Sequence, residues 1–152
     1  MQMDLDLAKF NMVEQQIRPW NVLSSQILET IAAVPRENFV PEQHRHLAFA
    51  DMQVPIGDGQ VMMQPKVEAR LLQELAPERD DFALEIGAGT GYVAALLAQT
   101  ALEVHTIEYR ESLVELAALN LQTNNIKNVD VIHGDAGRDW KSDIEYQTIF
   151  VS

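Results

Sequence analysis

This chain of 152 residues contains no cysteine and few basic residues. Without cysteine it can form no disulfide, no thiolate nucleophile and no cysteine-bound zinc site. Its 11 Lys and Arg residues are outnumbered by 23 Asp and Glu residues, which gives a formal net charge of −12. Nucleic-acid phosphates and anionic membrane surfaces are bound mainly through Lys and Arg, so neither is expected as a partner.

Long apolar runs are also missing. No stretch approaches the roughly 18 apolar residues of a membrane span, so none is expected. The amino-terminal residues are acidic and polar, unlike a secretory signal, and a cytoplasmic location is therefore expected. With 47% hydrophobic and 22% charged residues, the chain can build a core and is predicted to form a single domain over residues 1–152.

Residues 1–77 are predicted to form a helical cap that contains one loop. Prolines divide this part into short segments, and Pro19 is expected to end the first helix. Residues 54–60 are interpreted as a loop. Three apolar residues at helical spacing predict the buried stripe of the last helix: Val67, Leu71 and Leu75. The helices are expected at 4–17, from Ser24 or Ser25, at 42–49 and at 65–77.

Residues 78–152 alternate between strand and helix patterns. This alternation predicts an α/β, Rossmann-like fold, with a mainly parallel sheet and helices on its faces. The predicted strands are 82–86, 104–107, 129–132 and 148–151, and the predicted helices are 92–99 and 112–121.

A glycine-rich turn lies where the first of these strands gives way to a helix. Gly87, Gly89 and Gly91 permit a tight backbone turn and close approach of a ligand at a helix amino terminus. Glu108 ends the next strand, about 20 residues on, where a carboxylate can accept both hydroxyls of a ribose. A nucleoside cofactor is favoured over a purely structural turn and over a surface role for Glu108.

The motif also indicates which cofactor is bound. Tyr92 stands where a dinucleotide motif would have its last glycine, and Glu85 precedes the turn. A carboxylate at that point suits a cationic ligand better than a pyrophosphate. S-adenosylmethionine carries an ammonium and a sulfonium and no phosphate. Asp135 follows the third strand, where it could meet the adenine amino group, although a solvated turn is the alternative.

Several segments together resemble the protein-L-isoaspartate O-methyltransferases. The amino-terminal ones are the most specific, because many methyltransferases share the glycine turn. The matching segments are 12–17, 34–41 (V-P-R-x-x-F-V-P), 48–51, 55–60 with 64–65 (P-I-G-x-G-Q…Q-P), 84–92 and 133–140.

The resemblance implies S-adenosylmethionine-dependent methylation of the α-carboxylate of L-isoaspartyl residues in damaged proteins or peptides. By this resemblance the amino-terminal cap forms the acceptor side of the fold. The implied cofactor residues are Glu85 (at the ammonium), Gly87, Ala88, Gly89, Gly91, Glu108 (at the ribose), and Asp135 with Ala136 (at the adenine). The implied substrate loop contains Ile56, Gly57, Gly59 and Gln60.

The acceptor loop departs from the family pattern. Val61 and Met63 stand where the family has Thr and Ser, whose hydroxyls help to hold the acceptor carboxylate. Losing a hydrogen bond to a charged group costs about 1.5–3 kcal/mol, or roughly ten- to 150-fold in rate. We therefore expect weak or no methylation of isoaspartate, unless backbone amides of the loop hold the carboxylate instead.

Two other functions remain open at this point. One is a non-catalytic or divergent S-adenosylmethionine-binding module whose acceptor site no longer serves isoaspartate. The other is a methyltransferase for a small apolar acceptor. No metal site is expected, because His44 and His46 are typical of a polar helix surface.

The number of strands raises a further expectation. By the resemblance, such a sheet has seven strands, whereas this chain supplies four. We expect either that the sheet is truncated after the fourth strand, or that another chain, such as a second copy, covers the apolar edge of 148–151.

Overall fold

The first helix continues past the point where proline was expected to end it. The computed structural model describes residues 4–138 and 140–152. Helix α1 (Leu5–Met12) begins where the Asp4 carboxylate accepts the Leu7 N–H at 3.1 Å. A π-helical turn (Val13–Ile17) and a 3-10 turn (Arg18–Trp20) follow without a break. Pro19 is tolerated because it lies at the start of the 3-10 turn, where its missing N–H is not needed.

The rest of the cap consists of short helices. Helix α2 (Ser25–Ala33) is capped by Ser24, as predicted, since its Oγ accepts the Ile27 N–H at 3.4 Å. Two 3-10 segments follow, η3 (Arg36–Asn38) and η4 (Glu42–Leu47). The second occupies most of the helix predicted over 42–49.

The segment interpreted as a loop is a β-hairpin, so that interpretation was wrong. Strands β1 (Val54–Gly57) and β2 (Gln60–Met62) pair antiparallel. Asp58 and Gly59 connect them with φ of 50° and 70°. Two successive positive φ angles are the hallmark of the type I′ hairpin turn, for which Asp-Gly is a preferred sequence. The strands are too short for their alternation to be recognised.

Helix α3 (Pro65–Leu75) forms where predicted, but it buries a different face. Leu71 is 39% exposed, so the predicted stripe is wrong. The face is set by the buried carboxylate of Glu68, which bonds to Arg36 from the cap. The buried residues of α3 are Pro65, Glu68, Ala69 and Leu72.

The carboxy-terminal part is a four-stranded, entirely parallel sheet, which confirms the α/β prediction. Its order is β5-β4-β3-β6, and Leu84 pairs with His105 on one side and Ile149 on the other. The strands are β3 (Phe82–Ile86), β4 (Glu103–Glu108), β5 (Val129–His133) and β6 (Thr148–Val151). The helices between them are α4 (Tyr92–Ala98) and α5 (Glu111–Thr123).

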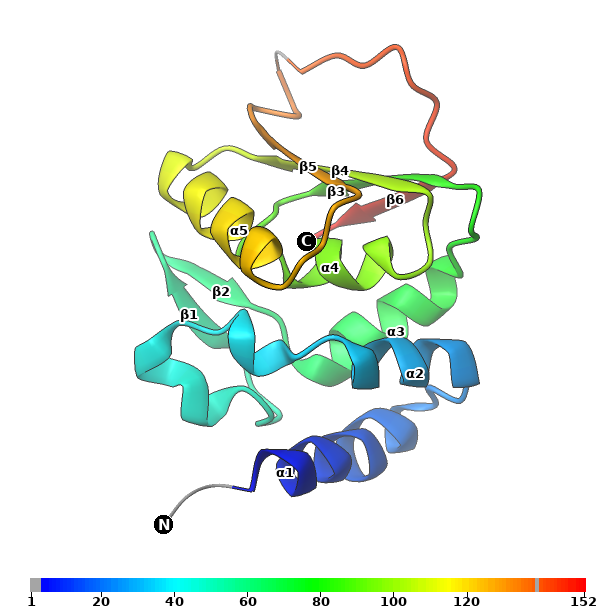
Figure 1. Cartoon of the computed structure of the whole chain (residues 1–152), viewed down its shortest axis with the longest axis vertical. Helices are drawn as coiled ribbons and strands as arrows, with labels where there is room; N and C mark the ends of the chain where they lie inside the picture. Colours follow the sequence, from blue (N-terminus) through cyan, green and yellow to red (C-terminus); the bar gives the residue numbers. More distant parts are fainter. Residues whose placement is uncertain (1–3, 139) are drawn as a thin grey trace.

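The described helices all lie on one side of this sheet. Figure 1 shows α3, α4 and α5 below the strands, and residues 134–138 and 140–147 above them. Helices on both faces were expected, and within residues 4–138 and 140–152 this is not the case. β6 is an edge strand, and Ile149 and Val151 on it are exposed. The expected cover over this edge stays a prediction.

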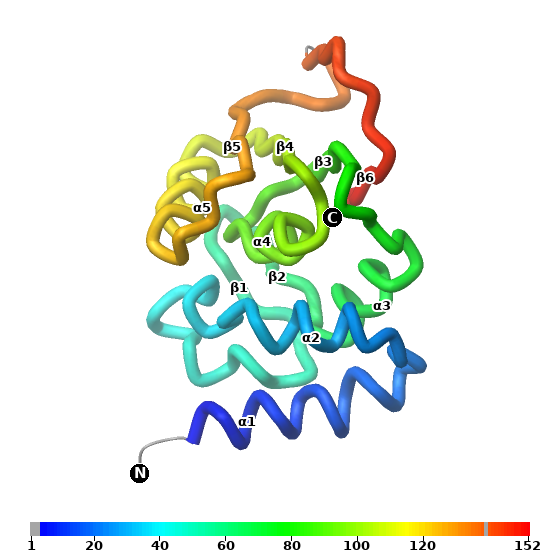
Figure 2. Tube along the Cα trace, turned by 45° about the vertical axis from the view of Figure 1, so that its right-hand side comes forward, coloured from blue at the N-terminus to red at the C-terminus, as the bar shows by residue number. Residues whose placement is uncertain are grey.

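The cap and the sheet enclose the hairpin. Figure 2 shows β1 and β2 between the cap helices and the layer formed by α4 and α5. Side chains from all these parts share one hydrophobic core, which includes Phe39, Ile56 and Leu96. No helix in the described part of the chain is long and apolar enough to cross a bilayer.

A buried ion pair joins these parts. The side chains of Arg36 and Glu68 bond to each other and are 1% and 3% exposed. Arg36 also donates from Nε to the Ala48 carbonyl at 2.8 Å, and from Nη2 to the Met63 carbonyl at 2.7 Å. Its guanidinium lies 4.8 Å from the ring centroid of Tyr92. One side chain thus connects the cap, the end of the hairpin, α3 and α4.

Removing one partner of this pair is expected to be costly. Glu68→Gln leaves a buried guanidinium without its counter-charge, which lowers the free energy of unfolding by about 3–5 kcal/mol. Urea denaturation at pH 8 measures this loss. The matched control is Glu74→Gln, which breaks the exposed Arg70–Glu74 pair on the same helix and costs at most about 0.5 kcal/mol. Equal losses of unfolding free energy in the two variants would contradict a stabilising role for the buried Arg36–Glu68 pair.

Candidate active site

A cavity opens where the carboxyl end of β3 meets the hairpin β1–β2. In open parallel sheets, ligands bind outside the carboxyl ends of the strands. The lining combines the hairpin, the glycine turn and the first residues of α4. The lining residues are Ile56, Gln60, Val61, Met62, Met63, Glu68, Glu85, Gly87, Ala88, Gly89, Thr90, Tyr92, Val93, Glu108, Leu113 and Ser152.

The backbone of the glycine turn has positive φ angles that other residues adopt only with strain. Gly87, Gly89 and Gly91 have φ of 96°, 53° and 86°. A Cβ on Gly87 would lie 2.8 Å from the Ser152 Oγ, and one on Gly89 would lie 3.3 Å from the Ile56 Cδ1. Glycine therefore lets both the end of β6 and the hairpin approach the turn closely.

Glu85 is the dominant electrostatic feature of the cavity. It is 1% exposed, and its carboxylate accepts the Thr106 hydroxyl at 2.6 Å. The pKa of Glu85 is raised to about 8, mainly by burial; the Thr106 bond lowers it, and the nearby Glu68 and Glu108 add to the rise. A buried carboxyl among other carboxyls favours a cationic ligand, because the cation stabilises the ionised form.

The neighbouring ionisable groups are also buried. Burial raises the pKa of Glu68 to about 7, and Arg36 keeps it from rising further. Burial likewise raises the pKa of the Tyr92 hydroxyl, which Arg36 opposes. Arg36 is therefore the positive charge that compensates this acidic end of the cavity.

Glu108 supports the turn from the adjacent strand. Its carboxylate accepts the Gly89 N–H at 3.1 Å and the Arg110 N–H at 2.9 Å. The side chain is 5% exposed and lines the cavity. The residue expected beside the ribose thus also fixes the conformation of the glycine turn.

The hairpin forms the opposite wall. Val61 is 46% exposed, whereas Met62 is buried and its sulfur accepts the Thr90 hydroxyl at 3.9 Å. The backbone of Met63 is held by Arg36 through its carbonyl. Val61 and Met63, which stand where the family has hydroxyl-bearing residues, therefore lie on a fixed backbone at the edge of the cavity.

The structure brings most of the sequence-predicted residues together. Nine of them line the cavity: Ile56, Gln60, Val61, Met63, Glu85, Gly87, Ala88, Gly89 and Glu108. Gly57, Gly59 and Gly91 shape the adjoining turns without lining it. Asp135 and Ala136 are not among the lining residues. The Asp135 carboxylate accepts the Gly137 N–H at 2.9 Å and lies 3.7 Å from Arg138.

Sequence reasoning missed some lining residues. Glu68 was overlooked because α3 was assigned the wrong buried face. A signal was present, since a lone acid between apolar neighbours on a helix indicates a partnered carboxylate. Nothing local indicated Ser152, because it reaches Gly87 only through the pairing of β3 with β6. The missed residues are Glu68, Thr90, Tyr92, Val93, Leu113 and Ser152.

Comparisons with known proteins point to one family. Residues 8–152 match the model of the protein-L-isoaspartate(D-aspartate) O-methyltransferases. A protein-L-isoaspartate O-methyltransferase 1 of Rhodopseudomonas palustris (strain HaA2) is 43% identical over 141 residues, which cover 93% of this chain and 58% of that protein. One from Petrotoga mobilis is 36% identical over 151 residues, covering 99% and 71%.

Solved structures share the fold. A protein-L-isoaspartate O-methyltransferase superposes with a TM-score of 0.78 at 23% identity, covering 97% of this chain and 47% of that one. A candidate enzyme of this kind from Plasmodium falciparum, in complex with S-adenosyl-L-homocysteine, gives a TM-score of 0.71 at 18% identity, covering 91% and 66%. At these identities the likeness concerns the fold alone.

The glycine turn provides a direct test of the cavity. Gly87→Ala places a Cβ against Ser152 at a positive φ, so we expect a loss of about 1–2 kcal/mol in the free energy of unfolding and weaker ligand binding. Gly134→Ala is the matched control, because its Cβ would meet only Ile107, at 3.9 Å. Chemical denaturation compares the two. A Gly87→Ala protein as stable as Gly134→Ala would refute the close approach of Ser152.

Proposed function

The chain belongs to the protein-L-isoaspartate(D-aspartate) O-methyltransferase family, and on that premise we propose that it transfers a methyl group from S-adenosylmethionine to the carboxylate of an isoaspartyl residue. The observation that carries this proposal is the buried Glu85 beneath the glycine turn, facing a cavity walled by the hairpin. Family membership supplies the reaction, and the cavity supplies a place for both reactants.

The residues of the cavity fit the cofactor. Glycine at 87 and 89 lets Ser152 and Ile56 lie close to the turn, and both of these residues line the cavity. Glu85 would pair with the ammonium of the cofactor, and Glu108 would accept its ribose hydroxyls. Bound there, S-adenosylmethionine supplies an electrophilic methyl group. We propose that Asp135 and Ala136, which follow β5, meet the adenine.

The acceptor needs alignment more than activation. A carboxylate is already ionised near pH 7, so no general base is required. The hairpin must instead orient its oxygen toward the methyl group and exclude water. Val61 and Met63 offer no hydroxyl for this purpose, so the backbone of residues 56–63 has to hold the acceptor. The Arg36 bond to the Met63 carbonyl keeps that backbone in place.

The substrates, cellular location and partners of the protein are also part of the proposal. The chain spans 58% of the length of the first relative that it matches, so the activity and partners of the whole protein are inferred. We propose damaged proteins or peptides as substrates, in the cytoplasm, with a second copy as a candidate cover for the edge of β6. The family match favours this enzyme over a non-catalytic module and over a methyltransferase for a small apolar acceptor.

Cofactor affinity should depend on pH through Glu85. The cation binds the ionised carboxylate, whereas the free protein holds its pKa at about 8. Binding below pH 8 must therefore expel a proton, so affinity falls by up to about tenfold for each pH unit between pH 8 and pH 6. Calorimetric titration with S-adenosylmethionine between pH 6 and 9 measures this profile.

Two variants test whether Glu85 causes this pH dependence of cofactor affinity. Glu85→Gln should bind weakly and show no such dependence, while Glu111→Gln, at an exposed position on α5, should retain it. An affinity that is constant from pH 6 to 9 in the unmodified chain would rule out Glu85 as the partner of the ammonium. No binding at any pH would remove the cofactor proposal altogether.

Restoring the hydroxyls should increase methyl transfer. Val61→Thr with Met63→Ser adds two donors at the acceptor wall, and we expect kcat/KM on an isoaspartyl peptide to rise roughly ten- to 150-fold for each bond realised in the transition state. Transfer of labelled methyl from the cofactor measures it. Val61→Ala with Met63→Ala is the control for the change in volume. Equal rates in the unmodified and hydroxyl-bearing proteins would show that the loop backbone alone holds the acceptor.

A further inference from the structure

Three side chains with metal-binding atoms meet on the sheet face opposite the described helices. Glu103 and His105 are two residues apart on β4 and so point to the same face. Asp130 is the register partner of His105 on β5. Their ligand atoms all lie within 4.8 Å of one another. We propose that Glu103, His105 and Asp130 bind a divalent transition-metal ion, with Zn²⁺ as the best match.

The orientation of His105 is the central observation. The residue is 8% exposed, and its Nε2 lies 2.7 Å from the Glu103 Oε1 and 3.8 Å from the Asp130 Oδ2. Two carboxylates therefore face a single ring nitrogen. Unless a proton or a metal ion stands between them, the nitrogen lone pair and the carboxylate oxygens repel each other.

The second nitrogen of the ring has a partner that allows the metal-bound form. Nδ1 lies 2.7 Å from the Tyr146 hydroxyl, which in turn lies 3.2 Å from the Ser142 Oγ. With Nδ1–H donating to Tyr146 and Tyr146 donating to Ser142, both of these protons have an acceptor and Nε2 presents its lone pair. Metal-bound histidines commonly donate their other N–H in this way, which fixes the tautomer and the ring orientation.

The donor set indicates the class of ion. One imidazole nitrogen and two carboxylate oxygens suit Zn²⁺ or a similar ion, whereas Mg²⁺ and Ca²⁺ prefer oxygen ligands alone. Two carboxylates also balance the charge of a divalent ion. Ligands around a tetrahedral Zn²⁺ lie about 3.3 Å apart, so the observed separations require only small carboxylate rotations. Water would complete the coordination.

The cluster is separate from the cofactor cavity. Glu103 begins β4 and Glu108 ends it, so five residues, or roughly 16 Å, separate the two places along the strand. Tyr146 belongs to the segment 140–147, which lies above the sheet in Figure 1. A bound ion would therefore join β4 and β5 and, through Tyr146, hold this segment against them. This inference does not depend on the proposed methyl transfer.

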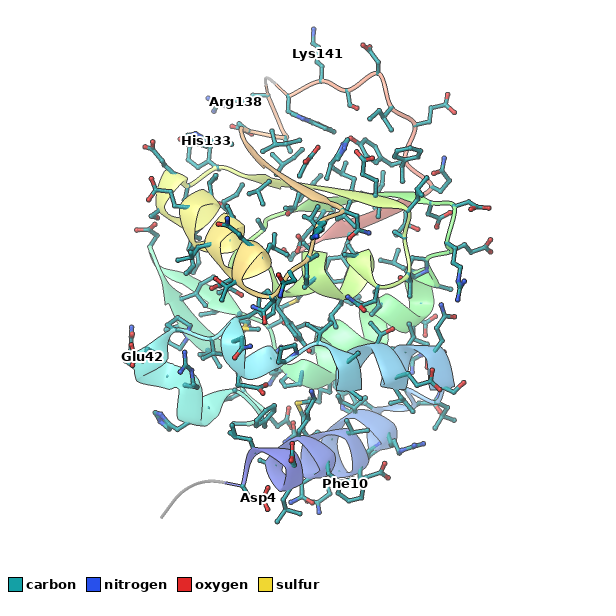
Figure 3. The ribbon with its side chains drawn as sticks, viewed as in Figure 1. Asp4, Phe10, Glu42, His133, Arg138 and Lys141 are labelled. Atoms are coloured by element: carbon teal, nitrogen blue, oxygen red, sulfur yellow. The ribbon has the colours of Figure 1, made fainter. Side chains whose placement is uncertain are left out.

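Calorimetric titration of the chain with Zn²⁺, and absorption spectroscopy with Co²⁺, test the site. We expect one ion per chain. His105→Gln and Asp130→Asn should each weaken binding at least tenfold, and Tyr146→Phe roughly ten- to 100-fold. His133→Gln is the matched control. Figure 3 labels His133 at the end of β5, outside the cluster, and its substitution should leave binding unchanged.

Two outcomes would overturn the proposal. The first is the absence of one-to-one binding in the unmodified chain. The second is unchanged affinity in Asp130→Asn, with the loss appearing instead when His44 and His46 are replaced. Asp130 serves as the decisive position because its side chain is 74% exposed, so its substitution is compatible with folding even if His105→Gln is not.

Discussion

The contacts of one buried guanidinium join the amino-terminal cap to the part of the chain that carries the parallel sheet. Arg36 belongs to the cap, yet it contacts the Glu68 carboxylate, the Met63 carbonyl and the ring of Tyr92. Each contact fixes a different wall of the cavity. Burying a charge is expensive unless every donor finds a partner, and here the guanidinium has a counter-charge and two carbonyls. Arg36 therefore helps to fix the position of the hairpin relative to the glycine turn, together with the shared core and the Thr90–Met62 contact.

The cavity combines a glycine turn with several buried carboxyl groups. Gly87 and Gly89 permit the turn, while Glu85 and Glu108 place carboxylates beneath and beside it. Glu108 stabilises the turn by accepting the Gly89 N–H, whereas Glu85 is left with a pKa near 8. One carboxylate is thus committed to the fold, and the other is available to a cationic ligand. A buried carboxyl group with a strongly raised pKa is typical of binding and catalytic sites.

Sequence reasoning succeeded where local patterns were strong. The strands 82–86 and 148–151 were predicted at their observed bounds, because short apolar runs next to turn residues are a local signal. The glycine turn and Glu85 were placed correctly for the same reason. The face of α3 was wrong, because the partner that buries Glu68 lies 32 residues away. The hairpin was missed although Asp58-Gly59 is a known turn sequence, because its strands are too short to show alternation.

The contact between Ser152 and Gly87 also has a kinetic consequence. Ser152 Oγ bonds to the Gly87 carbonyl across a separation of 65 residues, whereas Thr106 reaches Glu85 across only 21. Loop-closure entropy opposes the longer contact more strongly, and parallel pairing with such separations folds slowly. During folding, the contacts between β3 and β4 are therefore favoured to form early, and β6 docks later. Until β6 docks, the cavity lacks Ser152, one of the residues that line it beside the glycine turn.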